Sequence, residues 1–119
     1  MPVFDGYDNV FTMSGPNGRD EAHEFLSTLD KKDQARFQRY LVYLRDGHQV
    51  KSPEHMRRLH VKDHRDAEVH ELKTHSNGGL RLYVVRWNGK WYLTHGGKKV
   101  AERKVTQEAK RALAIFWGD

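Results

Sequence analysis

Hydrophobic residues between positions 19 and 47 recur at the spacing of two amphipathic helices. Asp30 is the expected N-cap of the second helix, with Asp33 three residues later, and Gly47 is the expected C-terminal stop. Because almost no linker separates them, the two helices are predicted to form a helical hairpin. The positions that follow the i, i+3, i+4, i+7 pattern of one helix face are Ala22, Phe25, Leu26 and Leu29, then Phe37, Tyr40, Leu41 and Leu44.

From residue 67 the apolar pattern changes to the two-residue period of β-strands. Asn88-Gly89 is a strong hairpin signal and predicts a type I′ turn. Near the C-terminus the apolar residues return to helical spacing, after Thr106 as the expected N-cap and before Gly118 as the expected stop. The predicted strands are 67–74, 80–87 and 90–95.

The remaining segments are polar or rich in glycine. Residues 1–18 are expected to be irregular or to hold a short strand, and residues 48–66 are expected to form a basic loop. The apolar residues available for the N-terminal strand are Val3, Phe4, Val10 and Phe11. The whole chain, residues 1–119, is therefore predicted to be a single α+β domain.

The two-residue turn fixes which side chains of the hairpin share a face, because directly opposite residues point the same way. The more aliphatic face is expected to pack on the helices; it carries Leu82, Val84, Arg86, Trp91, Leu93 and His95. The other face carries Arg81, Tyr83, Val85, Trp87, Lys90, Tyr92 and Thr94. Aromatic rings between cations suit RNA, since bases stack on rings while cations contact phosphates. The alternative is that these aromatic residues form ordinary cross-strand pairs against the N-terminal segment.

The composition excludes several classes of function. The chain has 119 residues and no cysteine, which excludes disulfide scaffolds, Cys-ligated zinc, Fe–S clusters and thiol catalysis. No apolar run approaches the roughly 18 residues needed to cross a bilayer. The first fifteen residues contain no Lys or Arg and no apolar core of a secretory signal. We therefore expect a soluble cytoplasmic domain with no membrane contact.

Positive charge is concentrated in the second part of the chain. Residues 1–47 carry six Lys/Arg against eight Asp/Glu, whereas residues 48–119 carry fifteen against eight. A basic half on a small domain indicates a polyanionic partner, nucleic acid being the first to consider. An acidic protein partner would explain the charge equally well. The simplest interpretation of such charge is solubility alone.

A glycine and lysine turn follows the last strand: Thr94-His95-Gly96-Gly97-Lys98-Lys99, then Arg103-Lys104. Glycines leave the backbone open, and such a turn can gather phosphate oxygens around one point. A surface charge run is the commoner explanation of such a cluster. His60 and His64 have the i, i+4 spacing of metal ligands, but no HExxH motif accompanies them. We expect neither a metal nor a cofactor.

Taken together, these motifs resemble the RelE/HigB superfamily of toxins from type II toxin–antitoxin systems, and most of all its phage-derived HigB-like branch. The resemblance covers about residues 19–116. It implies a small twisted antiparallel sheet, with two N-terminal helices packed on one face and a short C-terminal helix. It also implies cleavage of mRNA, often on the ribosome, and neutralisation by a cognate antitoxin of the helix-turn-helix kind. The resemblance rests on four segments: Val69-His70-Glu71-Leu72-Lys73, Gly79-Leu80-Arg81-Leu82-Tyr83, Tyr92 to Lys99, and Thr106-Gln107-Glu108-Ala109.

The resemblance also implies a set of catalytic residues. Arg81 matches the arginine that reaches the scissile phosphate, Lys98 and Lys99 match a basic pair after the third strand, and Lys73 matches a frequent cation on the preceding strand. His95 is the natural proton carrier, although strict hairpin register places it on the face opposite Arg81, and a bulge at Gly96-Gly97 could re-aim it. The chain departs from the family at Val69 and Glu71, where lysines are common, and at Thr106, where some members have tyrosine.

The hypothesis from sequence is a metal-independent endoribonuclease in which the RNA 2′-OH attacks the adjacent phosphate. Arg81, Lys98 and Lys99 would stabilise the transition state as fixed charges. Two alternatives stay open: a ParE-type toxin that acts on DNA gyrase, and a relative that binds RNA or a peptide without catalysis. The residues expected to bind RNA outside the reacting centre are Tyr83, Lys90, Tyr92, Arg103 and Lys104.

Overall fold

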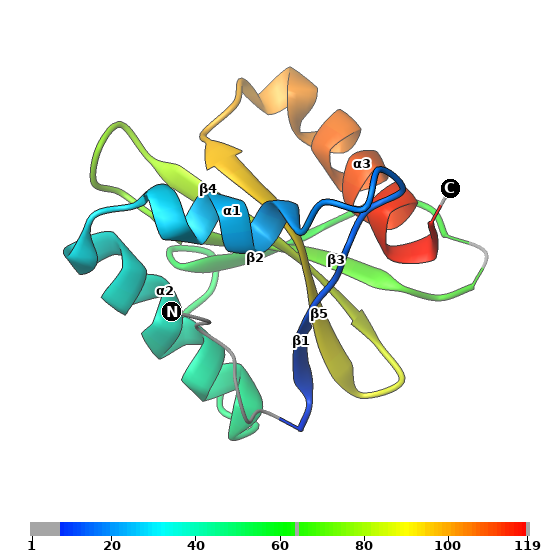
Figure 1. Cartoon of the computed structure of the whole chain (residues 1–119), viewed down its shortest axis with the longest axis horizontal. Coiled ribbons are helices and arrows are strands. Elements are labelled where there is room, and N and C mark those ends of the chain that lie inside the picture. The colour runs from blue at the N-terminus through cyan, green and yellow to red at the C-terminus, as the bar shows by residue number, and fades with distance from the viewer. Residues whose placement is uncertain (1–7, 64, 119) are drawn as a thin grey trace.

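A computed structural model describes residues 8–63 and 65–118 as an α+β fold, as predicted (Figure 1). Its elements, in chain order, are β1 (Val10–Thr12), α1 (Glu21–Thr28), α2 (Lys31–Arg45), β2 (Met56–Leu59), β3 (Glu68–Thr74), β4 (Leu80–Trp87), β5 (Lys90–Lys98), a 3-10 turn η1 (Glu102–Lys104) and α3 (Val105–Trp117). The strands form one five-stranded sheet in the order β1-β5-β4-β3-β2. Within the described ranges, no helix has both the length and the apolar character needed to span a bilayer.

The sheet is mixed, so the expectation of a purely antiparallel sheet is wrong at one edge. β1 runs parallel to β5 with Val10 beside Trp91, while the other neighbouring strands are antiparallel. The Trp91 backbone N–H donates to the Asn9 carbonyl at 2.8 Å. Val10 is buried, and this burial holds the short strand against the edge of β5. Val3 and Phe4, the other residues considered for a strand, lie outside the described ranges.

Helices α1 and α2 form the predicted hairpin, and each begins at an aspartate N-cap, of which Asp30 was predicted. The Asp20 side chain accepts a hydrogen bond from the His23 backbone N–H at 3.0 Å, and Asp30 accepts one from the Asp33 N–H at 2.9 Å. After α2, Gly47 takes a positive φ of 75°. The apolar faces of both helices share one core with the sheet, which includes Ala22, Leu26, Phe37, Leu41, Leu72, Leu82, Val84 and Leu93.

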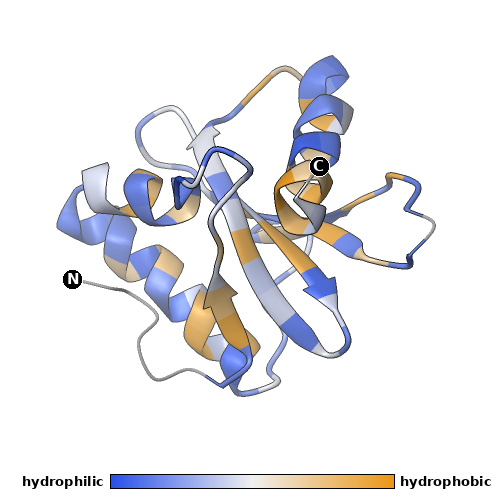
Figure 2. Cartoon of the chain, turned by 45° about the vertical axis from the view of Figure 1, so that its right-hand side comes forward, coloured by the Kyte–Doolittle hydropathy of each residue, from blue (hydrophilic) through white to orange (hydrophobic). Residues whose placement is uncertain are grey.

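Helix α3 covers the opposite face of the sheet and builds a second core with it. In Figure 2, hydrophobic segments of α3 lie beside hydrophobic segments of the strands. The helix begins at Val105 after Lys104, with no side-chain cap, so the expectation that Thr106 is the N-cap is wrong. Gly118 ends it at a φ of 76°, as predicted. The second core consists of Leu59, Ala67, Val69, Tyr83, Val85, Ala109, Ala112 and Leu113.

Strand β2 lies within the segment that was expected to be a basic loop. It pairs antiparallel with β3 at the sheet edge, with Arg57 opposite Glu71 and Arg58 opposite His70. Adjacent residues of a strand point to opposite faces, so Arg57 lies on the α3 side and Arg58 on the α1/α2 side. The strand carries two arginines between Met56, which joins the α1/α2 core, and Leu59, which joins the α3 core, so apolar and polar residues do not alternate and the pattern did not predict it.

Candidate functional site

Charged residues meet in a small cavity at the end of the sheet where β3 ends and β4 begins. In Figure 1 this end is marked by the arrowhead of β5, beside the chain that leads into α3. The cavity measures about 130 Å³ and opens on the α3 side of the sheet. It is lined by Arg57, Glu71, Lys73, Arg81, Lys99, Val100, Glu102 and Val105. Three of the predicted catalytic residues therefore come together: Lys73, Arg81 and Lys99.

Arg81 is held rigidly at the floor of this cavity. It is 6% exposed, and its Nε lies 3.2 Å from Oε1 of Glu71. Its Nη1 donates to the carbonyl oxygens of Thr74 at 3.2 Å and Leu80 at 3.0 Å. Among the described residues its Nη2 has no hydrogen-bond partner, which leaves this nitrogen for a ligand. The guanidinium is thus oriented before any substrate arrives.

Glu71 is the buried carboxylate that joins two arginines. It is 2% exposed, and its Oε2 lies 2.6 Å from Arg57, while its Oε1 faces Arg81. Arg57 also pairs with Glu102 at 2.9 Å, and these contacts raise its pKa although burial opposes them. A buried carboxylate needs such partners, because an unpaired charge in the interior is strongly destabilising. With four cations against two carboxylates, the cavity keeps a positive excess.

Two lysines complete the cavity. The pKa of Lys73 is lowered, first by burial and then by the neighbouring Arg57 and Arg81, while Glu71 acts in the opposite direction. A lysine of this kind exchanges a proton more readily near neutral pH. Lys99 is exposed, and its backbone N–H donates to the Gly79 carbonyl at 3.0 Å. A Cβ on Gly79 would meet Lys99 Cβ at 3.2 Å, so the glycine allows this close approach.

His95 does not reach this cavity, although the structure turns it to the same face as Arg81. The β4–β5 register shifts between Tyr83 and Val84, so that Tyr83 pairs with His95 and Thr94 is the extra residue. The predicted register of the hairpin is therefore wrong beyond Val84. The His95 ring stacks on Tyr83 at a centroid distance of 4.5 Å and is 1% exposed. Burial, with a contribution from Arg111, lowers its pKa to about 3. As described, His95 is neutral and shielded, which does not fit the role of proton carrier.

This burial gives a testable pH dependence of stability. An unfolded chain protonates His95 below about pH 6.5, whereas the folded protein resists protonation down to about pH 3, so stability is lost as the pH falls through this window. Relative to His95→Phe, which keeps an aromatic ring, we expect the wild-type protein to lose about 2 kcal/mol of unfolding free energy between pH 7 and pH 5. Urea unfolding at both pH values measures this difference. Parallel pH dependences of the two proteins would contradict it.

The aromatic face that was expected to meet RNA is covered instead. Tyr83 is 1% exposed beneath α3, so the prediction that it stacks on a base is wrong. Tyr92 packs between the rings of Phe11 and Phe116, at centroid distances of 5.4 and 4.9 Å. The covering element is mainly α3 rather than the N-terminal segment. These rings therefore act in the core.

The other predicted cations are dispersed. Lys98 pairs with Leu80, whose side chain belongs to the α1/α2 core, so Lys98 lies on the face opposite Arg81. Lys90 stands at the far end of the hairpin, near the Phe11 ring. Arg103 and Lys104 are exposed on η1, beside the cavity-lining Glu102.

The sequence did not predict three charged residues of the cavity. The sequence pattern places Arg57 in a basic loop and gives no role to Glu102. It marks Glu71 only as a departure from the family pattern. Their grouping depends on β2 pairing with β3, which has no local signal. His60 is exposed and His64 lies outside the described ranges; within those ranges no cluster of three or more His, Asp or Glu side chains could hold a metal.

Comparisons with known proteins give one informative result. No curated protein and no solved structure matches the chain significantly. A family model described as phage-derived protein Gp49-like (DUF891) matches residues 24–116. This stretch contains every residue that lines the cavity around Arg81. The chain therefore belongs to the phage-derived Gp49-like family.

Proposed function

We propose that this protein is the toxin of a toxin–antitoxin pair and cleaves mRNA in the cytoplasm without a metal. The observation that carries the proposal is the convergence of Arg57, Lys73, Arg81 and Lys99 on one cavity of about 130 Å³. Membership of the phage-derived Gp49-like family, together with the RelE/HigB resemblance, supports the toxin role. In the transition state of RNA cleavage the phosphate carries extra negative charge. Oriented cations of this kind would stabilise that charge.

In the proposed reaction, the RNA itself supplies the nucleophile. The 2′-oxygen forms a bond to the adjacent phosphorus while the bond from phosphorus to the 5′-oxygen breaks. The 2′ proton passes to a base, and the 5′-oxygen receives a proton as it leaves. The products are a 2′,3′-cyclic phosphate, or the 3′-phosphate formed from it by hydrolysis, and a 5′-OH end.

The cavity residues divide this work. Arg81 presents its Nη2 to a non-bridging phosphate oxygen, and Lys99 contacts the same phosphate from the exposed side. Lys73, with its lowered pKa, is the best candidate to carry a proton. Glu71 and Arg57 position Arg81 and do not themselves contact RNA. The cognate antitoxin, a small helix-turn-helix protein, would neutralise the toxin by covering these cations.

The test is cleavage of a defined mRNA by the purified protein, with and without ribosomes and in the presence of EDTA. We expect EDTA-resistant cuts that leave 5′-OH ends, and protection when the antitoxin encoded by the neighbouring gene is added. RNA that stays intact under all these conditions would overturn the endoribonuclease proposal. Inhibition of DNA gyrase by such a preparation would instead indicate a ParE-type toxin, and salt-sensitive RNA binding alone would indicate a non-catalytic relative.

A further inference from the structure

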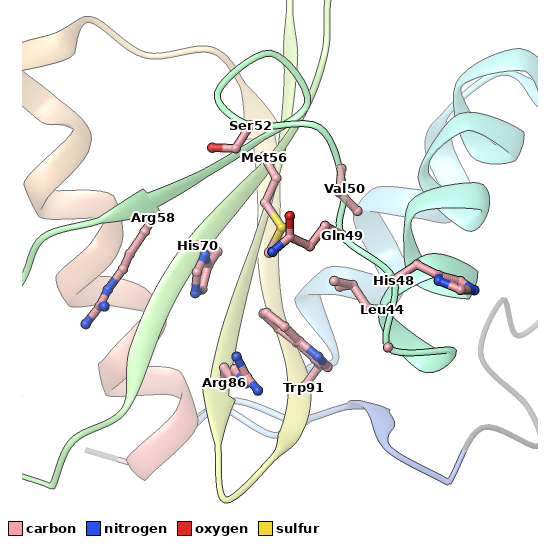
Figure 3. A pocket seen from close by; sticks show the side chains of 11 residues that line it. Leu44, His48, Gln49, Val50, Ser52, Met56, Arg58, His70, Arg86 and Trp91 are labelled. Atoms are coloured by element: carbon pink, nitrogen blue, oxygen red, sulfur yellow. The ribbon is translucent and has the colours of Figure 1, made fainter.

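A larger cavity lies on the other face of the sheet, away from Arg81. It measures about 470 Å³ and lies between the loop that follows α2 and residues of β2, β3, β4 and β5 (Figure 3). Small-molecule sites in proteins commonly have volumes of about 300–1,000 Å³. This cavity is therefore large enough to hold a small ligand, whereas the cavity at Arg81 has room for little more than a phosphate group.

Two arginines and a histidine from three adjacent strands line this cavity. Arg58 of β2, His70 of β3 and Arg86 of β4 lie on one face of the sheet, as Figure 3 shows, and Arg58 is paired directly with His70. Among the described residues, the side chains of Arg58 and Arg86 form no hydrogen bond and no ion pair. Arg86 stands over the Trp91 ring at 5.4 Å. This contrasts with Arg57 and Arg81, whose charges are already paired with Glu71.

Negative charge near these cations is limited. The cavity lining contains no carboxylate. Glu68 lies next to it, with its Oε1 3.2 Å from Nε2 of His70 and its backbone paired with Arg86. Burial, and then the two arginines, lower the pKa of His70 in spite of Glu68, so His70 offers a neutral ring for hydrogen bonding. The two arginines thus leave a positive excess that an anion can satisfy.

The rest of the cavity suits an organic ligand rather than a bare anion. Val50, Met56 and Trp91 supply an apolar wall, and each is less than a tenth exposed. Gln49, on the loop, adds an amide that can donate and accept hydrogen bonds. Figure 3 shows the Gln49 side chain on the loop side of the cavity and the arginines on the strand side. A pair of arginines next to an apolar wall and an amide matches the two parts of a nucleotide, a charged phosphate and a planar base.

We propose that this cavity binds a nucleotide, with its phosphate between Arg58 and Arg86 and its base against the apolar wall. Arginine recognises phosphate well, because its planar fork can donate two hydrogen bonds at once. The nucleotide is either a free mononucleotide or one unit of a single-stranded RNA. The proposal does not rest on RNA cleavage, because the cavity lies on the opposite face of the sheet from Arg81.

The test is a titration of the ¹⁵N-labelled full chain, followed by NMR at the Trp91 indole and the His70 ring. The probes are AMP, inorganic phosphate, acetate and a 2′-O-methylated hexaribonucleotide that cannot be cleaved. We expect AMP to shift both residues and to bind more tightly than phosphate, with acetate weakest. A hexamer that binds more tightly than AMP identifies RNA as the source of the nucleotide, whereas equal or weaker binding identifies a free mononucleotide.

Variants locate the binding. A protein carrying both Arg58→Gln and Arg86→Gln should bind AMP at least about tenfold more weakly, as expected when charge-assisted hydrogen bonds are lost. Arg39→Gln, on the exposed side of α2, is the matched control and should bind like the wild type. Arg81→Ala should also keep AMP binding, which separates this site from the proposed cleavage site. Unchanged binding by the double variant, equal responses to acetate and phosphate, or no response of Trp91 and His70 to AMP would each overturn the proposal.

Discussion

Replacement of Arg81 by alanine is expected to reduce RNA cleavage by about 10²–10³-fold, the loss typical of one preorganised donor at a developing charge. Arg81 is the most fixed cation of the cavity, since Glu71 holds its Nε and the carbonyl oxygens of Thr74 and Leu80 hold its Nη1. In the variant, no other group reaches the same position with the same orientation. The rate of cleavage of a defined RNA by the purified variant, and growth of cells that express it, measure the effect.

Folding of this variant must be separated from its activity. When Arg81 is removed, Glu71 keeps Arg57 at 2.6 Å, so the buried carboxylate still has a cation. Lys99→Ala provides a second test, because Lys99 is exposed and its truncation carries little structural cost. It should slow cleavage while leaving the thermal unfolding midpoint unchanged. Arg39→Ala is the control for loss of a distant surface charge. A folded Arg81→Ala protein with full cleavage rate would contradict the site assignment.

Local signals predicted the existence of the three helices and the hairpin turn correctly. Asp30 caps its helix as predicted, because a carboxylate next to free N–H groups needs no distant partner. Asn88 and Gly89 both take positive φ, at 51° and 74°, as a type I′ turn requires. Strand β4 was predicted with its observed bounds, 80–87. Each of these features depends on residues within a few positions of one another.

Features that depend on distant contacts were not predicted. Thr94 becomes the extra residue of β5, and its Oγ1 donates to the Tyr83 carbonyl at 3.1 Å, a contact that no period-two pattern indicates. The bulge moves His95 beneath α3, where it is buried. The side of the sheet that α3 covers is likewise decided by packing, since both faces of the hairpin carry large apolar residues. For this reason the sequence left open whether the aromatic face meets RNA or packs in the protein, and the structure shows it packed beneath α3.

The candidate site likewise combines features that the sequence predicted with features that depend on distant contacts. Lys73 and Arg81 share a face because β3 and β4 pair antiparallel, as the family resemblance implied, and they stand directly opposite each other. Lys99 joins them because β5 is longer than predicted and ends at Lys98, which places its successor at the cavity. Arg57 lies in β2 and Glu102 in η1, and both are far in sequence from Arg81. The sequence therefore predicted three of the four cations of the cavity, through the family resemblance, but not the ion pairs that orient Arg81.

Gly96 was interpreted as open backbone for phosphate binding, but the structure predicts that its substitution destabilises the fold. A Cβ on Gly96 would lie only 2.6 Å from Cε2 and Cγ of Phe25, so this glycine lets α1 pack closely on β5. Gly96→Ala forces the Phe25 ring to move, and we expect a loss of about 1–3 kcal/mol in unfolding free energy. Urea denaturation followed by circular dichroism measures it.

The neighbouring glycine provides a matched control for this substitution. A Cβ on Gly97 would meet no atom within 4 Å, and its φ is not in the left-handed region. Gly97→Ala should therefore change stability by less than about 0.5 kcal/mol. If the Phe25 ring is the obstacle, Phe25→Ala should cancel most of the cost of Gly96→Ala in a double-mutant cycle. Equal effects of the two glycine substitutions, or additivity of Gly96→Ala with Phe25→Ala, would show that close packing of α1 is not the reason for glycine at position 96.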